Sequence, residues 1–294
     1  MPNLKQIKTR IKSTQNLKKI TKALEVVSTV KLQKNRAKTE HMRDYFVKLA
    51  QLIAKVGDYT NVFYEIINPK SDRKLVILIS SDKGLCGASN SKLFKNITEQ
   101  YRDHKDTTDI FMIGKKWLEF AARSGYTVVG NLTLGDDYKQ SDLAALFAYI
   151  DINAAQYRNI SIVFNFFKNI LIQIPQSLTI YPLDMNQVEL LLEQSGLTLN
   201  IAQNKKSEDD TLIEPGMNEL NKELLRQIKQ YIIMSALQQN KLTEHAQRMI
   251  AMKWAKDNCG QLIDGLTLQY NKARQAAITK EISEIVSAKI AIEG

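Results

Sequence analysis

The placement of proline constrains this chain more than any other feature of its sequence. The 294 residues include five prolines, and none of them falls within residues 3–68 or 216–294. A proline inside a helix costs about 3 kcal/mol, so segments without proline can form long uninterrupted helices. Glycine is also scarce near the start, where Gly57 is the only one in the first sixty residues and stands where a helix would end. Both ends of the chain are therefore predicted to be long helices.

Both proline-free segments carry apolar residues at steps of three and four, the spacing of a coiled-coil seam. In the first segment these residues are Leu4, Ile7, Ile11, Leu17, Ile20, Leu24 and Val27. At ~1.5 Å per residue, a helix over residues 3–56 would be about 80 Å long and one over 218–292 about 110 Å. Helices of that length do not fit inside a domain of this size, so we expect the two to pair as an antiparallel coiled coil.

The middle of the chain alternates between strand-like and helix-like segments. Strands are predicted at residues 74–80, 109–113 and 126–131, and helices at 90–104, 115–124 and 141–157. Two more strands, 159–167 and 170–181, flank a short Lys168-Asn169 turn and are predicted to form an antiparallel hairpin. The order strand, helix, strand, helix is typical of a parallel sheet covered by helices.

The predicted fold class is α/β, with a long antiparallel coiled coil of the terminal helices and a central α/β domain. The predicted division is an N-terminal coiled-coil helix at 1–60, the α/β domain at 70–183, a connecting segment at 184–215 and a C-terminal coiled-coil helix at 216–294.

Basic residues are concentrated at the start of the chain. Residues 1–60 contain fourteen Lys and Arg against four Asp and Glu, a net charge of +10 that equals the value for the whole chain. Such a segment attracts acidic surfaces, which include nucleic acid, anionic lipid and acidic proteins. Residues 1–24 contain no acidic residue and resemble a mitochondrial presequence, but the helical pattern continues through them, so we interpret them as part of the folded protein. No apolar run approaches the ~18 residues that a membrane-spanning helix requires.

The sequence contains little that would support a metal, disulfide or catalytic site. Cys86 and Cys259 are the only cysteines, and they lack the spacing of a zinc site or a disulfide framework. The adjacent carboxylates at 136–137 and 209–210 are interpreted as solvated turn residues rather than as an acid/base pair. We expect no cofactor, no metal and no catalytic site in this chain.

One loop has the setting of a phosphate-binding site. The segment SSDKGLCGASN, residues 80–90, follows a predicted strand, precedes a predicted helix and contains Gly84 and Gly87. Phosphate-binding loops use glycine because backbone N–H groups must approach the anion closely. The spacing here is GxxG and matches neither GxxxxGK[ST] nor GxGxxG, so we interpret the loop as a tight turn with Ser89 or Asn90 as the helix N-cap.

Several stretches, in order along nearly the whole chain, resemble the gamma-subunit family of F-type ATP synthases, the central rotor shaft. They include KITKAL (19–24), the loop SSDKGLCGASN, IEPGMNELNKELL (213–225) and the C-terminal stretch YNKARQAAITKEISEIV (270–286). Leu24 stands where the family usually has Met, and Trp254 is an unusually bulky residue.

The resemblance implies a Rossmann-like topology without a bound nucleotide in the central domain. It implies that the chain couples proton-driven rotation of a membrane ring to the conformational cycling of an alpha–beta hexamer during ATP synthesis. The implied partners are the alpha and beta subunits, the epsilon subunit and the membrane rotor ring, with no nucleic acid and no small-molecule substrate. The implied location is peripheral, on the cytoplasmic face of the bacterial inner membrane.

The same resemblance implies which residues contact the beta subunits: Arg274, Gln275, Thr279, Glu281, Arg248, Lys19, Lys22 and Leu24. On a helix, Arg274, Gln275, Thr279 and Lys280 are expected to place polar groups across a narrow arc beside an alanine-rich face. The forked guanidinium of Arg274 can bind a carboxylate at two points.

The residues themselves leave two other classes open. One is a nucleotide-binding enzyme that uses the 80–90 loop. The other is a basic coiled-coil nucleic-acid-binding protein, which is disfavoured because residues 1–44 contain no aromatic side chain that could stack on a base.

Overall fold

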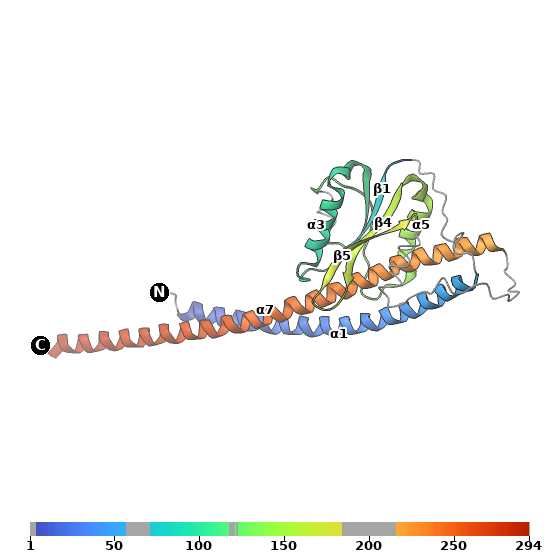
Figure 1. Cartoon of the computed structure of the whole chain (residues 1–294). Coiled ribbons are helices and arrows are strands. Elements are labelled where there is room, and N and C mark those ends of the chain that lie inside the picture. Colours follow the sequence, from blue (N-terminus) through green and yellow to red (C-terminus); the bar gives the residue numbers. More distant parts are fainter. Residues whose placement is uncertain (1–3, 57–70, 118–120, 122, 184–215, 294) are drawn as a thin grey trace. The chain divides into compact units, whose positions relative to one another are not determined.

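The computed structural model describes residues 4–56, 71–117, 121, 123–183 and 216–293 (Figure 1). The chain forms two compact units. One comprises Met1–Thr29 with Arg248–Gly294, and the other comprises Val30–Gln247. Helices α1 (Leu4–Val56) and α7 (Met217–Glu293) each contribute to both units. The prediction of two long terminal helices is confirmed.

The Val30–Gln247 unit contains a five-stranded sheet in the order β3-β2-β1-β4-β5. Parallel pairing joins β1 to β2, β1 to β4 and β2 to β3, whereas β4 and β5 are antiparallel. The strands are β1 (Lys74–Ile79), β2 (Thr108–Ile113), β3 (Thr127–Leu132), β4 (Asn159–Phe167) and β5 (Gln173–Tyr181). The predicted sheet, parallel except for a final hairpin, is confirmed.

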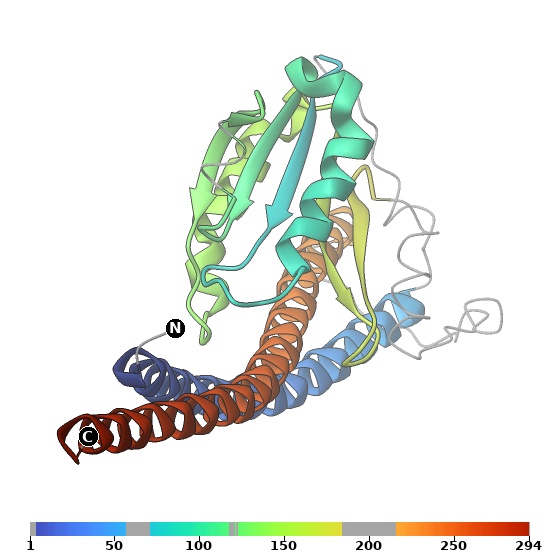
Figure 2. The same cartoon turned by 90° about the vertical axis from the view of Figure 1, so that its left-hand side faces the viewer.

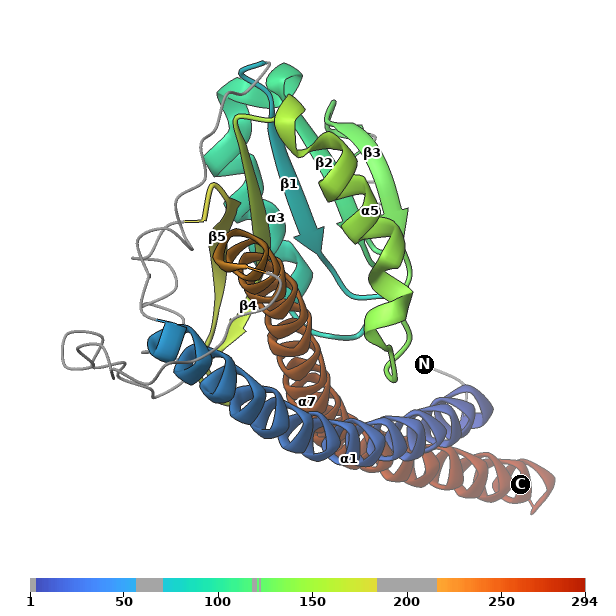
Figure 3. The ribbon, with the colours of Figure 1, turned by 90° about the vertical axis from the view of Figure 1, so that its right-hand side faces the viewer.

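Helices cover both faces of this sheet (Figures 2 and 3). Helix α3 (Ser89–Tyr101) lies on one face and α5 (Ala144–Asn153) on the opposite face. Short 3-10 turns extend them: η1 (Arg102–Thr107) follows α3, and η2 (Gln140–Leu143) and η3 (Ala154–Gln156) flank α5. The helix predicted at 115–124 lies partly outside the described residues.

Alternation along β1 divides its side chains between two hydrophobic cores. The odd-numbered residues from Leu75 to Ile79 face α5 and the Val30–Gln247 parts of α1 and α7, and the even-numbered residues between them face α3. In the first core, the Phe46 ring of α1 stacks on the Tyr231 ring of α7 with 4.1 Å between centroids. The long helices therefore belong to the same core as the sheet within this unit.

The loop between β4 and β5 is longer than predicted. β5 begins at Gln173 rather than at residue 170, so residues 168–172 form the loop. Asn169 Oδ1 accepts hydrogen bonds from the N–H groups of Leu171 (2.9 Å) and Ile172 (2.8 Å). An asparagine that binds the backbone two residues onward favours a turn over a strand. The apolar residues after Asn169 consequently lie in the loop, where Leu171 is 78 % exposed.

In the unit of Met1–Thr29 with Arg248–Gly294, α1 and α7 run antiparallel, side by side (Figure 1). Lys256 Nζ donates a hydrogen bond to Glu25 Oε2 at 2.8 Å. Further along α7, a Cβ atom added at Gly260 would lie 3.2 Å from Lys18 Nζ. On α7 the buried positions recur every seven residues, as a coiled coil requires, at Met252, Cys259 and Leu266.

The seam predicted on α1 holds at Ile7, which is 3 % exposed, and at the half-buried Leu4, Ile11 and Leu24, but it is wrong at the other three positions. Leu17, Ile20 and Val27 are 50 %, 57 % and 49 % exposed, whereas Thr21 and Ser28 are buried. Burial of these two hydroxyl groups is possible because each donates to a carbonyl one turn earlier in its own helix, Thr21 to Leu17 O at 3.1 Å and Ser28 to Leu24 O at 2.7 Å. Three of the seven predicted seam residues of α1 therefore face outward rather than toward α7.

No described helix combines the length and the apolar content that crossing a bilayer requires.

Candidate functional site

Loop 80–88 lies at the carboxyl end of β1. Because β2 and β4 lie on opposite sides of β1, this is the point at which open α/β sheets bind ligands. The predicted N-cap is wrong: α3 begins after Ala88 without a side-chain cap from any described residue. Asn90 instead accepts a hydrogen bond from the Ser81 N–H at 3.3 Å and donates one to Ser81 Oγ at 2.7 Å. The loop is thus closed by its own side chains.

Gly87 makes room for α7 rather than for a phosphate group. Its φ of +57° is in the left-handed region that favours glycine, and an added Cβ would lie 2.8 Å from Gln247 Oε1. An added Cβ at Gly84 would meet only Lys116, at an ordinary contact distance of 3.7 Å. The glycine spacing therefore reflects a tight turn and the close approach of α7, and the geometry does not favour a nucleotide-binding enzyme.

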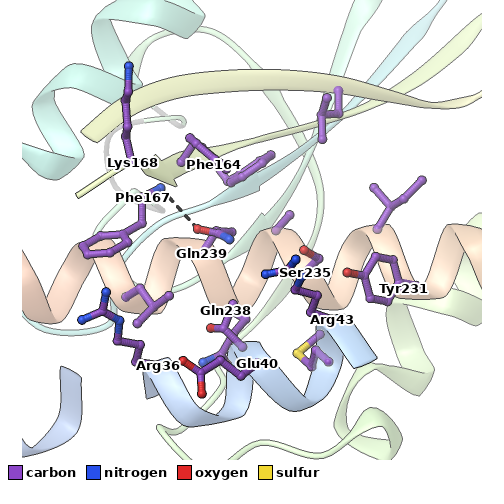
Figure 4. Close-up of a pocket in the computed structure, with 17 residues that line it drawn as sticks. Arg36, Glu40, Arg43, Phe164, Phe167, Lys168, Tyr231, Ser235, Gln238 and Gln239 are labelled. Atoms are coloured by element: carbon purple, nitrogen blue, oxygen red, sulfur yellow. Dashed lines mark hydrogen bonds between the residues drawn. The ribbon is translucent and has the colours of Figure 1, made fainter. Parts of the chain in front are cut away.

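A cavity of about 460 Å³ is bordered by α1, β4 and α7 within the Val30–Gln247 unit (Figure 4). Arg36, Arg43 and Lys168 line it with positive charge, and Glu40 adds one carboxylate. None of its lining residues belongs to loop 80–90. Across the described part of the chain, no group of three or more His, Cys, Asp and Glu side chains could hold a metal ion.

Three lysines of α1 bind carboxylates of the same chain. Lys34 Nζ and Lys38 Nζ lie 2.9 Å and 2.7 Å from Asp137 Oδ1, and Lys31 forms an ion pair with Asp136. Hydrogen bonds from Lys38 and Lys34 lower the pKa of Asp137 to about 2. Residues 136–137 do lie in a turn and Asp137 is exposed, as predicted, but they also form ion pairs that join the loop after β3 to α1. The carboxylates at 209–210 lie outside the described residues.

Four of the predicted contact residues lie on the exposed surface near the end of α7: Arg274, Gln275, Thr279 and Glu281. Within the described residues none of the four side chains has a hydrogen bond or an ion pair, so their polar groups are available to a partner. Exposed isoleucines lie among them, with Ile278 at 47 % and Ile282 at 56 %. This end of α7 thus exposes isoleucines among charged side chains, which include Arg274 and Glu281.

The expectation of a narrow polar arc is wrong. At about 100° per residue, Arg274, Gln275, Thr279 and Lys280 spread over roughly two thirds of the helix circumference. Lys280 also lies 3.5 Å from Glu284 Oε1, in an exposed pair four residues apart. The polar groups therefore point in several directions rather than to one side.

Arg248 differs from the other predicted contact residues, because it is only 9 % exposed. Most of its surface is covered by its own chain, so it offers little area to a partner.

At the other end of the chain, Lys19 and Lys22 are exposed and Leu24 is half-buried. Neither lysine has an ion pair among the described residues. They lie next to the outward apolar residues Leu17 and Ile20 of α1. The sequence pattern found these apolar residues but assigned them to the wrong partner, the helix α7.

Comparison with known proteins gives consistent matches. A family model described as ATP synthase matches residues 3–292. The ATP synthase gamma chain of Halothermothrix orenii is 33 % identical, with 100 % of both chains covered. That of Ruthia magnifica subsp. Calyptogena magnifica is 35 % identical, with 98 % of this chain and 99 % of the relative covered.

Among solved structures, two mitochondrial ATP synthases contain similar chains. In the Euglena gracilis structure of OSCP, F1 and c-ring, the TM-score is 0.68 at 18 % identity, covering 98 % of this chain and 94 % of that chain. In the Tetrahymena thermophila structure of the central stalk and c-ring, it is 0.58 at 20 % identity, covering 80 % and 99 %. At these identities the likeness shows a shared fold.

The family model and the relatives span both long helices and the whole sheet between them. Identity of about one third therefore extends over all the elements described above, rather than over one domain. The chain belongs to the ATP synthase gamma chain family.

Proposed function

We propose that this chain is the central-stalk rotor subunit of an F-type ATP synthase, which couples rotation of a membrane ring to conformational cycling of the alpha–beta hexamer. The observation that carries the proposal is the outer surface of the unit formed by Met1–Thr29 and Arg248–Gly294. Apolar side chains at regular helical spacing lie exposed there on both helices. Such a surface is characteristic of a protein that is enclosed by partners.

Two unlike helices present a different surface at each angle of rotation. The α1 face combines apolar residues with Lys19 and Lys22, whereas the α7 face combines isoleucines with Arg274 and Glu281. A subunit of the hexamer changes conformation as the shaft turns only if its contacts with the shaft differ between its two states. In this mechanism the gamma chain contributes coupling free energy through contacts, and the chemistry of ATP synthesis belongs to the hexamer.

We assign the beta-subunit contacts to the exposed members of the predicted set, which are Arg274, Gln275, Thr279, Glu281, Lys19 and Lys22, together with the half-buried Leu24. Arg248 is a weaker candidate because of its burial. Arg274 is the strongest, because its guanidinium has no ion pair with any described residue and can bind a carboxylate through two parallel hydrogen bonds.

The remaining partners are assigned to the Val30–Gln247 unit. The similar chains of E. gracilis and T. thermophila belong to structures that include a c-ring. We infer that the α/β unit of this chain contacts the epsilon subunit and the membrane ring. This arrangement places the protein peripherally on the cytoplasmic face of the bacterial inner membrane.

Copurification tests the proposal directly. A tagged copy expressed in its own cell is expected to bring down the alpha and beta subunits in a fixed ratio, as determined by mass spectrometry of the purified complex. Recovery of the tagged chain without either subunit would end the rotor assignment. Saturable binding of ATP or NAD by the isolated chain would favour a nucleotide-binding enzyme, and steeply salt-dependent DNA affinity would favour a nucleic-acid-binding protein.

Arg274→Ala is expected to lower the rate of ATP synthesis by the assembled complex about tenfold. A charge-assisted hydrogen-bonded contact contributes roughly 1.5–3 kcal/mol, and about 1.4 kcal/mol corresponds to a factor of ten. The measurement is proton-driven ATP synthesis in reconstituted vesicles. Lys272→Ala is the matched control, because Lys272 is an exposed cation two residues away on the same helix and outside the predicted contact set. Equal rates for the two variants would contradict the assignment of Arg274.

A further inference from the structure

One segment of α7 is buried all round although its side chains are mostly polar. We call residues 238–247 the polar collar. Within it, Gln238 and Asn240 are 2 % exposed, Lys241 is 6 %, Thr243 is 0 % and His245 is 1 %. A helix that is polar all round normally lies in solvent, and burying polar groups is unfavourable unless they find partners. Apolar packing therefore does not explain why these polar side chains are buried.

On one side, the collar is bonded to α1 and to the segment that follows β3. Gln238 Nε2 donates to Asn35 O at 2.7 Å, and Tyr138 Oη donates to Gln238 Oε1 at 3.2 Å. About two turns onward, on the same side of the helix, His245 Nε2 lies 3.5 Å from Asp136 Oδ1. Asp136 is itself paired with Lys31 of α1.

On the opposite side, the collar is bonded to the sheet. Asn240 Oδ1 accepts from the Asn165 N–H at 3.2 Å, and Thr243 Oγ1 donates to Asn165 O at 3.3 Å. Gln239 Oε1 accepts from the Phe167 N–H at 3.3 Å (Figure 4). These N–H groups of β4 lie beyond the last residue paired with β1, so α7 continues the hydrogen bonding that β1 no longer provides.

A buried cation completes the ring of contacts. Lys241 Nζ donates to Leu134 O at 3.2 Å and lies 3.5 Å from Asp82 Oδ2, in the loop after β1. At about 100° per residue, Gln238 and Asn240 point about 160° apart, and Lys241 and Thr243 occupy the two flanks between them. The collar is thus held from every direction around the axis of α7.

Directional contacts resist a motion that apolar packing tolerates. Apolar surfaces attract without regard to direction, so a helix held by them alone can turn about its axis and repack. Hydrogen bonds weaken steeply when their angle is lost, and contacts on opposite sides of α7 would break together if it turned. Buried polar contacts are also poor means of stabilisation, since replacing both partners by apolar groups of similar volume is often neutral or stabilising.

We propose that the polar collar is the joint that transmits torque between the sheet of the Val30–Gln247 unit and α7. It does so by preventing rotation of the helix about its own axis. This inference rests on the proposed rotor function, because only a chain that carries torque needs such a joint. The apolar core around Tyr231, which precedes the collar on α7, supplies the stability, and the collar supplies torsional stiffness.

The test compares two double variants with the same chemical changes on the same helix. Asn240→Leu with Lys241→Met removes collar contacts, and Asn218→Leu with Lys222→Met is the matched control at exposed positions. Each is assembled into the complete ATP synthase and stalled, and the angular fluctuation of a probe fixed to the α/β unit is recorded. The variance for the collar variant is expected to rise about twofold or more relative to the control, because contacts on two sides of the helix are lost.

The same complexes are then assayed in vesicles. The collar variant is expected to hydrolyse ATP within about twofold of the control, while protons pumped per ATP fall severalfold as the opposing gradient builds up. Equal angular variance and equal pumping in the two variants would overturn the collar proposal. A control complex that hydrolyses ATP without any rotation of the probe would instead contradict the rotor function itself.

Thr243→Val provides a second, milder variant in case the double variant fails to assemble. It is nearly isosteric and removes a single donor, the one to Asn165 O. A purely structural role predicts that thermal stability and pumping fall together. Because a buried carbonyl loses this donor, thermal stability is expected to fall in either case. A torque-bearing role predicts increased angular variance in addition, and unchanged variance would overturn it.

Discussion

Gly114→Ala is expected to lower the free energy of unfolding of the Val30–Gln247 unit by about 3–5 kcal/mol, the largest effect of any single substitution considered. Gly114 follows β2 with φ +104°, and an added Cβ would lie 2.4 Å from Ser80 O. Adopting such a φ with a side chain costs about 1–3 kcal/mol, and a clash with a packed neighbour adds a similar amount. The neighbour cannot move away, because the Ser80 N–H is bonded to Ile113 O at 2.7 Å.

Two further glycines separate these effects. Gly125 has φ +79° and no atom within 4 Å of an added Cβ, so Gly125→Ala measures the backbone effect without the clash. Gly135 has neither constraint, and Gly135→Ala is expected to be neutral or slightly stabilising. The measurement is urea unfolding of the full chain in a Trp254→Phe background, in which the buried Trp117 reports on the α/β core. If Gly114→Ala and Gly125→Ala lowered the free energy of unfolding by similar amounts, the surrounding structure would have moved to relieve the clash.

Asp109→Asn is expected to lower the free energy of unfolding of the same unit by about 2–3 kcal/mol. Asp109 is 5 % exposed, and its Oδ2 accepts from Arg73 Nε at 3.1 Å and from Tyr157 Oη at 3.0 Å. Breaking a buried ion pair costs about 3–5 kcal/mol, and we reduce this because the Arg73 side chain is 40 % exposed. An amide offers one oxygen where the carboxylate offers two, so an N–H group would face a donor.

The neighbouring tyrosine cannot relieve this conflict by losing its proton. Burial, the hydrogen bond with Tyr149 and the charge of Asp109 raise the pKa of Tyr157, so it remains a donor at neutral pH. Asp103→Asn, at an exposed position, is the control and is expected to change the free energy by less than about 0.5 kcal/mol. The same tryptophan-monitored unfolding provides the measurement, and equal midpoints for the two variants would contradict the prediction.

The elements that could be predicted from the sequence are those set by local rules. Proline-free segments gave the two long helices, and alternating apolar runs gave the strands, because each depends on residues close together in the chain. The β4–β5 loop was missed because the side chain of Asn169, rather than the apolar pattern around it, decides where the strand starts. Boundaries of this kind depend on individual hydrogen bonds that a periodicity count ignores.

The contact-dependent features could not be predicted in the same way. Thr21 and Ser28 were not recognised as seam residues, because their hydroxyl groups are satisfied within α1 and no apolar signal marks them. Lys241 and His245 have the composition of a solvent-facing segment, and only the approach of β4, the loop after β1 and the segment after β3 buries them. For the interaction surface, the resemblance supplied the residues, and the structure shows that Arg248 alone among them is largely covered.

The outward apolar residues of α1 have a consequence for the chain before it is assembled with its partners. In the chain by itself Leu17, Ile20 and Val27 are about half exposed to water, and in the proposed rotor they would be covered only after assembly with the hexamer. Regularly spaced apolar side chains on a helix attract other such helices, including those of identical copies. If the chain is made in excess of the other subunits, the surplus molecules are therefore expected to self-associate or to bind chaperones. The exposed apolar face of α1 thus requires that production of this chain match that of its partners.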